Sequence, residues 1–255
     1  MAKKYYVVWQ GHKPGIYTDW ATCSKQVAKY SGARYKSFPN LAEAEAAYGG
    51  AGAVAANGKA TSKPIRVNSG AAKTFTAKEV EALTEEVKIF TDGGCEPNPG
   101  KAGSGLALYR KNELDELWYG LYNPMGTNNT AELNALHQAM IMGQSELKSG
   151  MSVAIFCDSK YSIQCITDWA VSWERKGWKK SGGEIKNLEL IKDMFSLYQT
   201  IKDELKILHV NGHVGVEGNE LADRMSIYAM ISKEPEFARY NNELDVDALL
   251  AMRAG

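Results

Sequence analysis

The sequence predicts an α/β protein: a mixed sheet flanked by helices, preceded by a small separate α/β domain. Three observations lead to this prediction. Three strand-like stretches stand together between residues 87 and 122, and helical and strand-like stretches then alternate to residue 233. The first 48 residues contain strand-like and helical stretches of their own. A segment with a linker composition separates the two parts. Consecutive strands followed by alternating helices and strands favour a mixed sheet with helices packed on it.

The N-terminal block, residues 1–48, is expected to fold as a compact α/β unit. YYVVW at residues 5–9 is rich in β-branched and aromatic residues, and the turn residues 13–15 separate it from a hairpin partner at 16–20. Helices are expected near 22–30 and 40–48. The block holds seven basic and three acidic residues, an excess of four positive charges in a chain that is neutral overall. That excess indicates an anionic partner.

Residues 49–86 have the composition of a flexible linker, because Gly, Ala, Ser and Lys dominate the stretch GGAGAVAANGKATSKPIRVNSGAAK. Its last part, AKEVEALTEE at 77–86, is a candidate for a short helix. Residues 233–255 are expected to be a loose acidic tail.

Residues 87–232 are expected to form the main domain. Its apolar periodicity changes between strand-like and helix-like stretches along the chain. The expected strands are 87–92, 104–110, 116–122, 151–158 and 205–211, and the expected helices are 128–143, 159–177, 187–203 and 219–233. The first three strands are compatible with an antiparallel meander.

Composition excludes several classes of protein. No run of about 18 apolar residues is present, so no membrane span is expected. The start, MAKKYYVVWQ, lacks the apolar core of a secretory signal. The four cysteines form no CxxC pair, which argues against a disulfide framework or a zinc knuckle. A cytoplasmic location fits this cysteine usage best.

Four acids stand where one expected element gives way to the next. Asp92 ends the first strand of the main domain, Asp158 ends the strand MSVAIFCD, and Glu132 and Asp223 lie in the first turns of helices. Ligand chemistry in α/β sheets concentrates at strand ends. Each acid also has an ordinary structural explanation: a hairpin turn for Asp92, a capping box from Asn129 for Glu132, and helix capping or the helix dipole for the other two.

Taken together, the four acids favour a cation site. Two carboxylates 4 Å apart repel by about 1 kcal/mol in water and by about 4 kcal/mol at a surface-like dielectric, so a cluster of four needs cations among the acids. Ligands that are all oxygen suit magnesium or manganese rather than zinc. Two such ions about 3.5–4 Å apart clamp the attacking and leaving oxygens of a phosphodiester.

The motifs that contain these acids resemble those of type 1 ribonuclease H. TDGGCEPNPG, TNNTAEL, FCDSKY and GHVGVEGNELAD occur in that order within residues 87–230. The resemblance implies a ribonuclease H-like fold with a five-stranded mixed sheet flanked by helices. It also implies endonucleolytic hydrolysis of the RNA strand of RNA–DNA hybrids, leaving 5′-phosphate and 3′-hydroxyl ends. The implied ligands of two Mg²⁺ ions, with Mn²⁺ as the alternative, are Asp92, Glu132, Asp158 and Asp223.

The same resemblance implies roles for further residues. His213 lies on a glycine-rich loop and corresponds to a histidine that assists proton transfer or product release, roles that suit a ring titrating near neutrality. A solvent-exposed histidine without a role is the alternative. The implied substrate contacts are Asn98, Asn128, Asn129 and Gln164 in the minor groove, Thr127 and Asn187 around a DNA phosphate, and Trp173, Trp178 and Lys179 in a basic protrusion.

The N-terminal block resembles the small hybrid-binding domain that precedes the nuclease in many members of this family. YYVVWQGHKPGIYTDW and ARYKSF carry this resemblance. It implies that Trp20 and Tyr35 stack on the DNA strand with Tyr6 nearby, and that Lys36 contacts phosphate. The implied partner is an RNA–DNA hybrid, with duplex RNA as a further partner of this block. A monomer is expected.

Two other functions stay open at this point. Another nuclease or a strand-transfer enzyme can share the same fold. A non-catalytic protein that binds hybrid or duplex RNA would keep the fold, although loss of one acid would be its expected mark and all four are present. Mg²⁺-dependent cleavage of hybrid, duplex RNA and duplex DNA separates the three.

Overall fold

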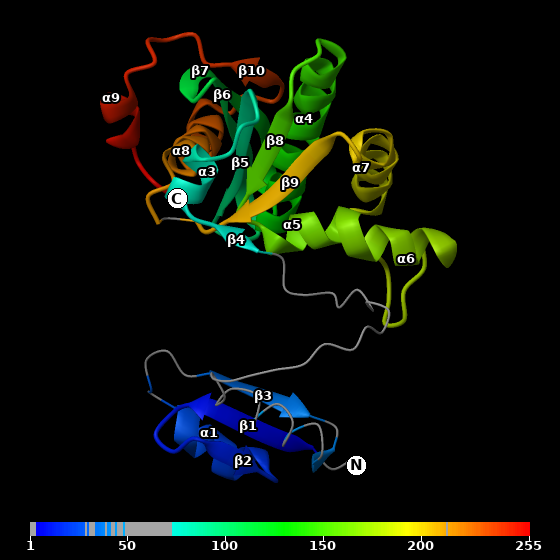
Figure 1. The fold of residues 1–255 in the computed structure, drawn as a ribbon. Helices are drawn as coiled ribbons and strands as arrows, with labels where there is room; N and C mark the ends of the chain where they lie inside the picture. Colours follow the sequence, from blue (N-terminus) through cyan, green and yellow to red (C-terminus); the bar gives the residue numbers. More distant parts are fainter. Residues whose placement is uncertain are drawn as a thin grey trace, which may run out of the picture. The chain divides into compact units, whose positions relative to one another are not determined.

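The computed structural model describes residues 4–28, 30, 34–38, 40, 41, 44, 48, 73–212 and 214–255. The chain divides into two compact units, residues 1–67 and 68–255 (Figure 1).

The first unit is built on a three-stranded antiparallel sheet. Its strands are β1 (Tyr5–Gln10), β2 (Gly15–Tyr17) and β3 (Arg34–Phe38), in the order β2-β1-β3. The helix α1 (Trp20–Val27) begins at Asp19, whose carboxylate accepts a 2.7 Å hydrogen bond from the Thr22 N–H. Val8 and Cys23 are fully buried, because α1 packs its buried side against β1.

The described residues of the second unit form a seven-stranded mixed sheet in the order β10-β7-β6-β5-β8-β9-β4. Its central strands form an antiparallel meander, β5–β6–β7, onto which β8 and β9 add in parallel. These five strands are the mixed sheet that the sequence predicts, so the fold class is confirmed. Their bounds are β5 (Val87–Glu96), β6 (Gly100–Arg110), β7 (Glu113–Gly126), β8 (Val153–Cys157) and β9 (Leu205–Val210).

Helices cover both faces of this sheet (Figure 1). On one face, Ile89 of β5 packs among residues of α4 (Asn128–Lys148) and α7 (Leu188–Ile201). On the other, Phe90 of β5 packs against α8 (Glu217–Ser232). Alternate residues of a strand point to opposite faces, so β5 contributes to both cores. Three consecutive helical pieces follow β8 before α7: α5 (Lys160–Gln164), the π-helix η1 (Cys165–Trp169) and α6 (Ala170–Arg175).

The segment before β5 belongs to the second unit, which differs from the prediction of a linker up to residue 86. The strand β4 (Thr74–Phe75) pairs in parallel with β9, and α3 (Ala77–Glu81) begins with a capping box between Thr76 and Glu79. Val80 is buried against the sheet. The described part of the second unit therefore begins at residue 73, and residues 49–72 lie outside the described part of the chain.

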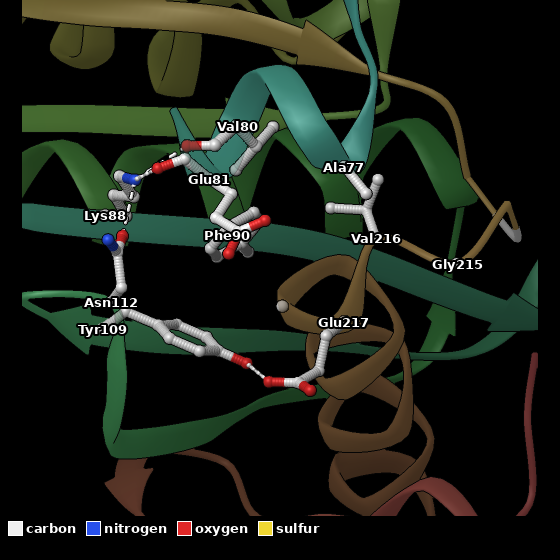
Figure 2. A pocket seen from close by; sticks show the side chains of 11 residues that line it. Ala77, Val80, Glu81, Lys88, Phe90, Tyr109, Asn112, Gly215, Val216 and Glu217 are labelled. Carbon is white, nitrogen blue, oxygen red and sulfur yellow. Dashed lines mark hydrogen bonds between the residues drawn. The ribbon is translucent and has the colours of Figure 1, made fainter. Parts of the chain in front are cut away.

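A buried cation fastens α3 to the sheet (Figure 2). The Lys88 Nζ donates to the carbonyl oxygens of Val80 (2.7 Å) and Glu81 (3.3 Å) and to the Asn112 Oδ1 (2.6 Å). Beneath α3 lies a pocket of about 290 Å³, across which the Tyr109 hydroxyl donates to Glu217 at 2.7 Å. Lys88 and Tyr109 thus pair with other residues that line this pocket.

The C-terminal residues are ordered, which differs from the prediction of a loose tail. The strand β10 (Phe237–Arg239) pairs with β7, and the ring of Phe237 stacks on Trp118 with centroids 5.8 Å apart. The helix α9 (Val246–Leu250) packs on α8 through Leu249, which is buried. Sequence polarity concealed this, because the anchoring side chains are spread along an acidic stretch: Leu249 is buried, Phe237 stacks on Trp118, and Tyr240 packs edge-on against Tyr119 and Tyr228.

Among the described residues, none of the helices combines the length and the apolar character needed to cross a bilayer. All four cysteines are free thiols, and three of them are buried.

Candidate active site

Asp92 lies in the middle of β5 rather than at its end, because the strand continues to Glu96. It follows Phe90 by two residues, so its side chain points to the α8 face of the sheet. Only 9% of Asp92 is exposed, and the Ser226 hydroxyl of α8 donates a 2.8 Å hydrogen bond to its Oδ2. Strand and helix thus fix this carboxylate between them.

Glu132 comes from the opposite face, on α4. The cap of this helix is Thr127, whose hydroxyl accepts from the Thr130 N–H, so the predicted capping box from Asn129 to Glu132 does not form. The Glu132 side chain is therefore free to face the sheet. At Gly93 the backbones of β5 and α4 are in contact: a Cβ added there would lie 2.2 Å from the Glu132 backbone nitrogen. The absence of a side chain at Gly93 brings Glu132 close to Asp92.

Asp158 follows β8, the parallel neighbour of β5. Capping of α5 falls to Ser159, whose hydroxyl accepts from the Ser162 N–H at 3.3 Å. The Asp158 carboxylate instead accepts a 3.2 Å hydrogen bond from the Asn219 side-chain amide of α8. The expected capping role of the Asp158-Ser159 pair therefore belongs to the serine.

Asp223 lies in the second turn of α8, because that helix begins at Glu217, earlier than the sequence predicts. A Cβ added to Gly105 of β6 would lie 2.2 Å from the Ala222 carbonyl oxygen, so α8 rests directly on the sheet. The Asp223 carboxylate accepts hydrogen bonds from the Gly255 N–H, at 3.1 and 3.2 Å to its two oxygens, and from the Arg224 guanidinium.

The four carboxylates line one pocket of about 510 Å³. Burial, and next the charge of Asp158, raises the pKa of Asp92 to about 7, with a further contribution from Asp223. Burial also raises the pKa of Glu132 well above its usual range, helped by the charges of Asp92 and Asp158. Without a cation, the protein therefore holds Asp92 and Glu132 in an environment that disfavours their ionised forms.

The donors in this pocket fit hard divalent cations. The Glu132 Oε2 is buried and has no hydrogen-bond partner among the described residues. One ligand atom each of Glu132, Asp158 and Cys157 lies within 4.8 Å of the others. Burial raises the pKa of the Cys157 thiol well above its usual range, so this group stays protonated and leaves a set of carboxylate oxygens. Such a set suits Mg²⁺ or Mn²⁺. A carboxylate offers about four lone-pair sites, so the contacts that Asp223 already makes leave room for a cation.

Comparison with known proteins assigns both units. Residues 84–230 match the RNase H family, and residues 4–48 match the family of the Ribonuclease H1 N-terminal domain. The chain belongs to the RNase H family. Ribonuclease H from Pseudomonas savastanoi pv. phaseolicola is 38% identical over 145 residues, which cover 56% of this chain and 92% of that protein. Ribonuclease HI from Pseudomonas aeruginosa is 36% identical over 143 residues and is covered to 91%.

Solved structures show the same fold. LC9-RNase H1, a type 1 RNase H with the type 2 active-site motif, aligns with a TM-score of 0.50 and 21% identity, over 67% of this chain and 87% of that one. The foamy viral protease-reverse transcriptase in complex with RNA/DNA hybrid aligns with a TM-score of 0.51 and 18% identity, over 67% of this chain and 22% of that one. As a member of its family, this chain is an endonuclease that hydrolyses RNA in RNA–DNA hybrids.

A second hollow of the RNase H domain, about 500 Å³, gathers four of the nine predicted substrate contacts. In it the Thr130 hydroxyl donates to the Asn187 Oδ1 at 3.1 Å and lies 2.8 Å from the Thr127 hydroxyl. The Asn128 N–H donates to the Asn98 Oδ1 at 3.3 Å. These bonds join the start of α4, the loop after β5 and the start of α7. The predicted residues among its lining are Asn98, Thr127, Asn129 and Asn187, whereas Asn128 lines the carboxylate pocket.

Four predicted residues of the nuclease lie elsewhere. Gln164 is exposed at the end of α5 and lines neither hollow. Trp173 and Trp178 are partly buried against the main core, and Trp178 packs edge-on against Phe195 with centroids 6.0 Å apart. They anchor the basic protrusion instead of standing free on it, and Lys179 beside them is exposed. His213 lies outside the described residues.

The N-terminal unit carries an exposed aromatic patch. The Trp20 ring centroid lies 5.5 Å from that of Tyr6 and 5.7 Å from that of Tyr35, and Trp20 and Tyr35 are 47% and 46% exposed. The next residue of β3, Lys36, points to the other face, with its Nζ 5.8 Å from the Phe38 ring centroid. The three predicted aromatics are thus adjacent, and the predicted lysine is directed away from them.

Sequence reasoning missed four partners of the carboxylates: Ser226, Asn219, Arg224 and Gly255. Asn219 stands four residues before Asp223, the spacing of one helix face, and this was a usable signal. Ser226 stands three residues after Asp223, on the same helix face, whereas no such spacing marked Gly255, because its contact with Asp223 joins segments that are distant in sequence.

Proposed function

We propose that this RNase H hydrolyses the RNA strand with two divalent cations held by Asp92, Glu132, Asp158 and Asp223, leaving 5′-phosphate and 3′-hydroxyl ends. The observation that carries the proposal is the convergence of these four carboxylates on one pocket, with the Glu132 Oε2 buried and without a partner among the described residues. Mg²⁺ is the expected ion. When bound, such a pair of cations activates a water and stabilises charge on the scissile phosphate.

The chain's own residues prepare the site. Ser226 orients Asp92 by donating to its Oδ2, and Asn219 does the same for Asp158. These bonds fix carboxylates that would otherwise rotate, so their oxygens are positioned before a cation arrives. His213 is proposed to move a proton or to assist product release.

The second hollow supports recognition of the hybrid. We propose that Thr127 and Asn187 hold a phosphate of the DNA strand, while Asn98, Asn128, Asn129 and Gln164 contact the minor groove. The RNA strand differs from DNA by its 2′-hydroxyl, and the DNA strand must deform to reach a phosphate pocket. Lys179, with Trp173 and Trp178 beneath it, extends the contact along the duplex.

The N-terminal unit is proposed to hold the hybrid while the nuclease cuts it. The patch of Tyr6, Trp20 and Tyr35 offers aromatic faces for stacking on the DNA strand. Lys36 would contact phosphate from the other face of the edge strand β3, and duplex RNA is proposed as a further partner of this unit. Tethering of two binding units raises avidity by about 10²–10⁴ without new contacts. We propose that the protein acts as a monomer in the cytoplasm.

The test is cleavage of matched RNA–DNA hybrid, duplex RNA and duplex DNA in Mg²⁺, with the product ends mapped. The proposal expects cleavage of the RNA strand of the hybrid alone, with 5′-phosphate and 3′-hydroxyl products. Asp92→Asn should keep hybrid binding and lose cleavage. Cutting of duplex DNA would favour another nuclease on the same fold, and binding without cutting would favour a non-catalytic protein.

A further inference from the structure

A groove of about 400 Å³ adjoins the catalytic pocket of the RNase H domain. The two hollows share Glu96, Ile227, Met230 and Arg253 as lining residues, so one opens beside the other. The hollow that we propose for the DNA phosphate shares no lining residue with this groove. The groove is therefore within reach of a strand whose scissile phosphate lies at the carboxylates.

The groove is lined by three cations, Lys101, Lys233 and Arg253, and one anion, Glu96. Arg253 forms an ion pair with Glu96. Lys101 and Lys233 are exposed, and neither has a carboxylate partner within the part of the chain that the structure describes. The groove thus keeps two uncompensated positive charges beside a pocket of negative ones.

Three separate elements place these cations. Lys101 stands at the start of β6, and Lys233 ends α8 in a left-handed backbone conformation. Arg253 follows α9, whose position is fixed by the buried Leu249 and by a hydrogen bond from the Arg224 Nε to the Leu250 carbonyl oxygen. Lys233 and Arg253 lie beyond residue 230, where the match to the RNase H family ends. The C-terminal segment therefore adds a cationic wall to the nuclease.

We propose that this groove binds phosphates of the RNA strand on one side of the cleaved bond, with Lys101 and Lys233 as the contacting cations. The proposal rests on the function proposed above, because it takes the carboxylate pocket as the place of the scissile phosphate. Ile227 and Met230 are the apolar residues among the four that both hollows share, and a sugar would lie against them. Exposed lysines that face a polyanion contribute affinity that falls with added salt.

The test compares the Lys101→Gln/Lys233→Gln double variant of the full chain with the unaltered protein in Mg²⁺ on one defined hybrid. We expect KM to rise about threefold to tenfold, with a larger effect on KM than on kcat. The slope of log(kcat/KM) against log salt should become shallower by about one for each phosphate that a lysine no longer neutralises. The matched control is Lys148→Gln/Lys202→Gln, which removes two exposed charges at the far ends of α4 and α7.

A second arm identifies the strand. Hybrids are made with the RNA shortened on the 5′ or the 3′ side of the cleaved bond, opposite an unchanged DNA strand. The difference between the double variant and the unaltered protein should vanish for one of the two. A difference that persists for both, or a double variant that behaves as the control does, overturns the proposal. If the unaltered chain cuts no hybrid, the proposed function itself fails, and that outcome is distinct.

Discussion

Replacing Asp92 with asparagine should stabilise the cation-free protein above neutral pH, although it removes a charge from a well-formed site. The Asp92 pKa is raised from 3.8 to about 7, chiefly by burial and then by Asp158. In the folded state the proton is therefore held more tightly than in the unfolded state. Stability is lost as pH rises between about 4 and 7 and stays low above that range.

The magnitude follows from the size of the shift. Three pKa units at 1.36 kcal/mol each correspond to about 4 kcal/mol of unfolding free energy, as an upper figure. Asparagine carries no charge and keeps an oxygen that accepts the hydrogen bond from Ser226. Asp92→Asn should then be more stable than the parent by about 2–4 kcal/mol at pH 8, and by much less at pH 5.

The assay is urea unfolding in EDTA at several pH values, followed by tryptophan fluorescence, because four of the six tryptophans belong to the second unit. Addition of Mg²⁺ at pH 8 should stabilise the parent and leave Asp92→Asn nearly unchanged. A variant that is less stable than the parent at pH 8 in EDTA would refute the claim that the buried, ionised Asp92 destabilises the cation-free protein. An equal Mg²⁺ effect on both proteins would refute the assignment of Asp92 to the cation site.

Three further substitutions test the construction of the site and of the N-terminal unit. Ser226→Ala removes a hydrogen bond to the charged acceptor Asp92, worth about 1.5–3 kcal/mol. It should lower kcat about tenfold and shift the acid limb of the pH–rate profile to higher pH. An unchanged profile contradicts the role of Ser226. Gly93→Ala places a Cβ against the α4 backbone, so it should lower the free energy of unfolding by about 3 kcal/mol and abolish cleavage. The control is Gly150→Ala, whose Cβ meets no other atom but whose φ is +84°. It should lower the free energy of unfolding by about 1–2 kcal/mol and retain cleavage. Trp20→Ala should weaken hybrid binding by about 1–3 kcal/mol and reduce the number of cuts per encounter, approaching the effect of deleting residues 1–60; equal processivity of all three proteins would show that the first unit does not hold the substrate.

The sequence predicts the main sheet and its helices because apolar residues recur along these segments at clear strand-like and helix-like spacings. It also places the four carboxylates near the edges of elements, but it misjudges the details. Asp92 lies within β5 and Asp223 lies in the second turn of α8, because the strand continues beyond the glycines and the helix starts earlier than its apolar pattern does. The convergence of the side chains depends on backbone contacts at Gly93 and Gly105, which only the folded chain displays.

Other features follow from contacts between distant segments, which single-sequence patterns do not contain. The short strands β4 and β10 are held by backbone pairing with the longer strands β9 and β7, and each is too short to show an apolar alternation in the sequence. In the sequence, Trp173 and Trp178 stand close to lysines, which suggests a nucleic-acid-binding surface, yet in the structure both pack against the core. Arg253 reaches the catalytic pocket only because α9 docks on α8.

The most direct test of the central claim is anomalous scattering from Mn²⁺ in crystals of the intact chain with a hybrid protected at the cleaved bond by phosphorothioate. We expect two peaks about 3.5–4 Å apart, each within bonding distance of carboxylate oxygens from the set Asp92, Glu132, Asp158 and Asp223. Manganese bound away from this pocket, or a pocket that stays empty with hybrid in place, would contradict it.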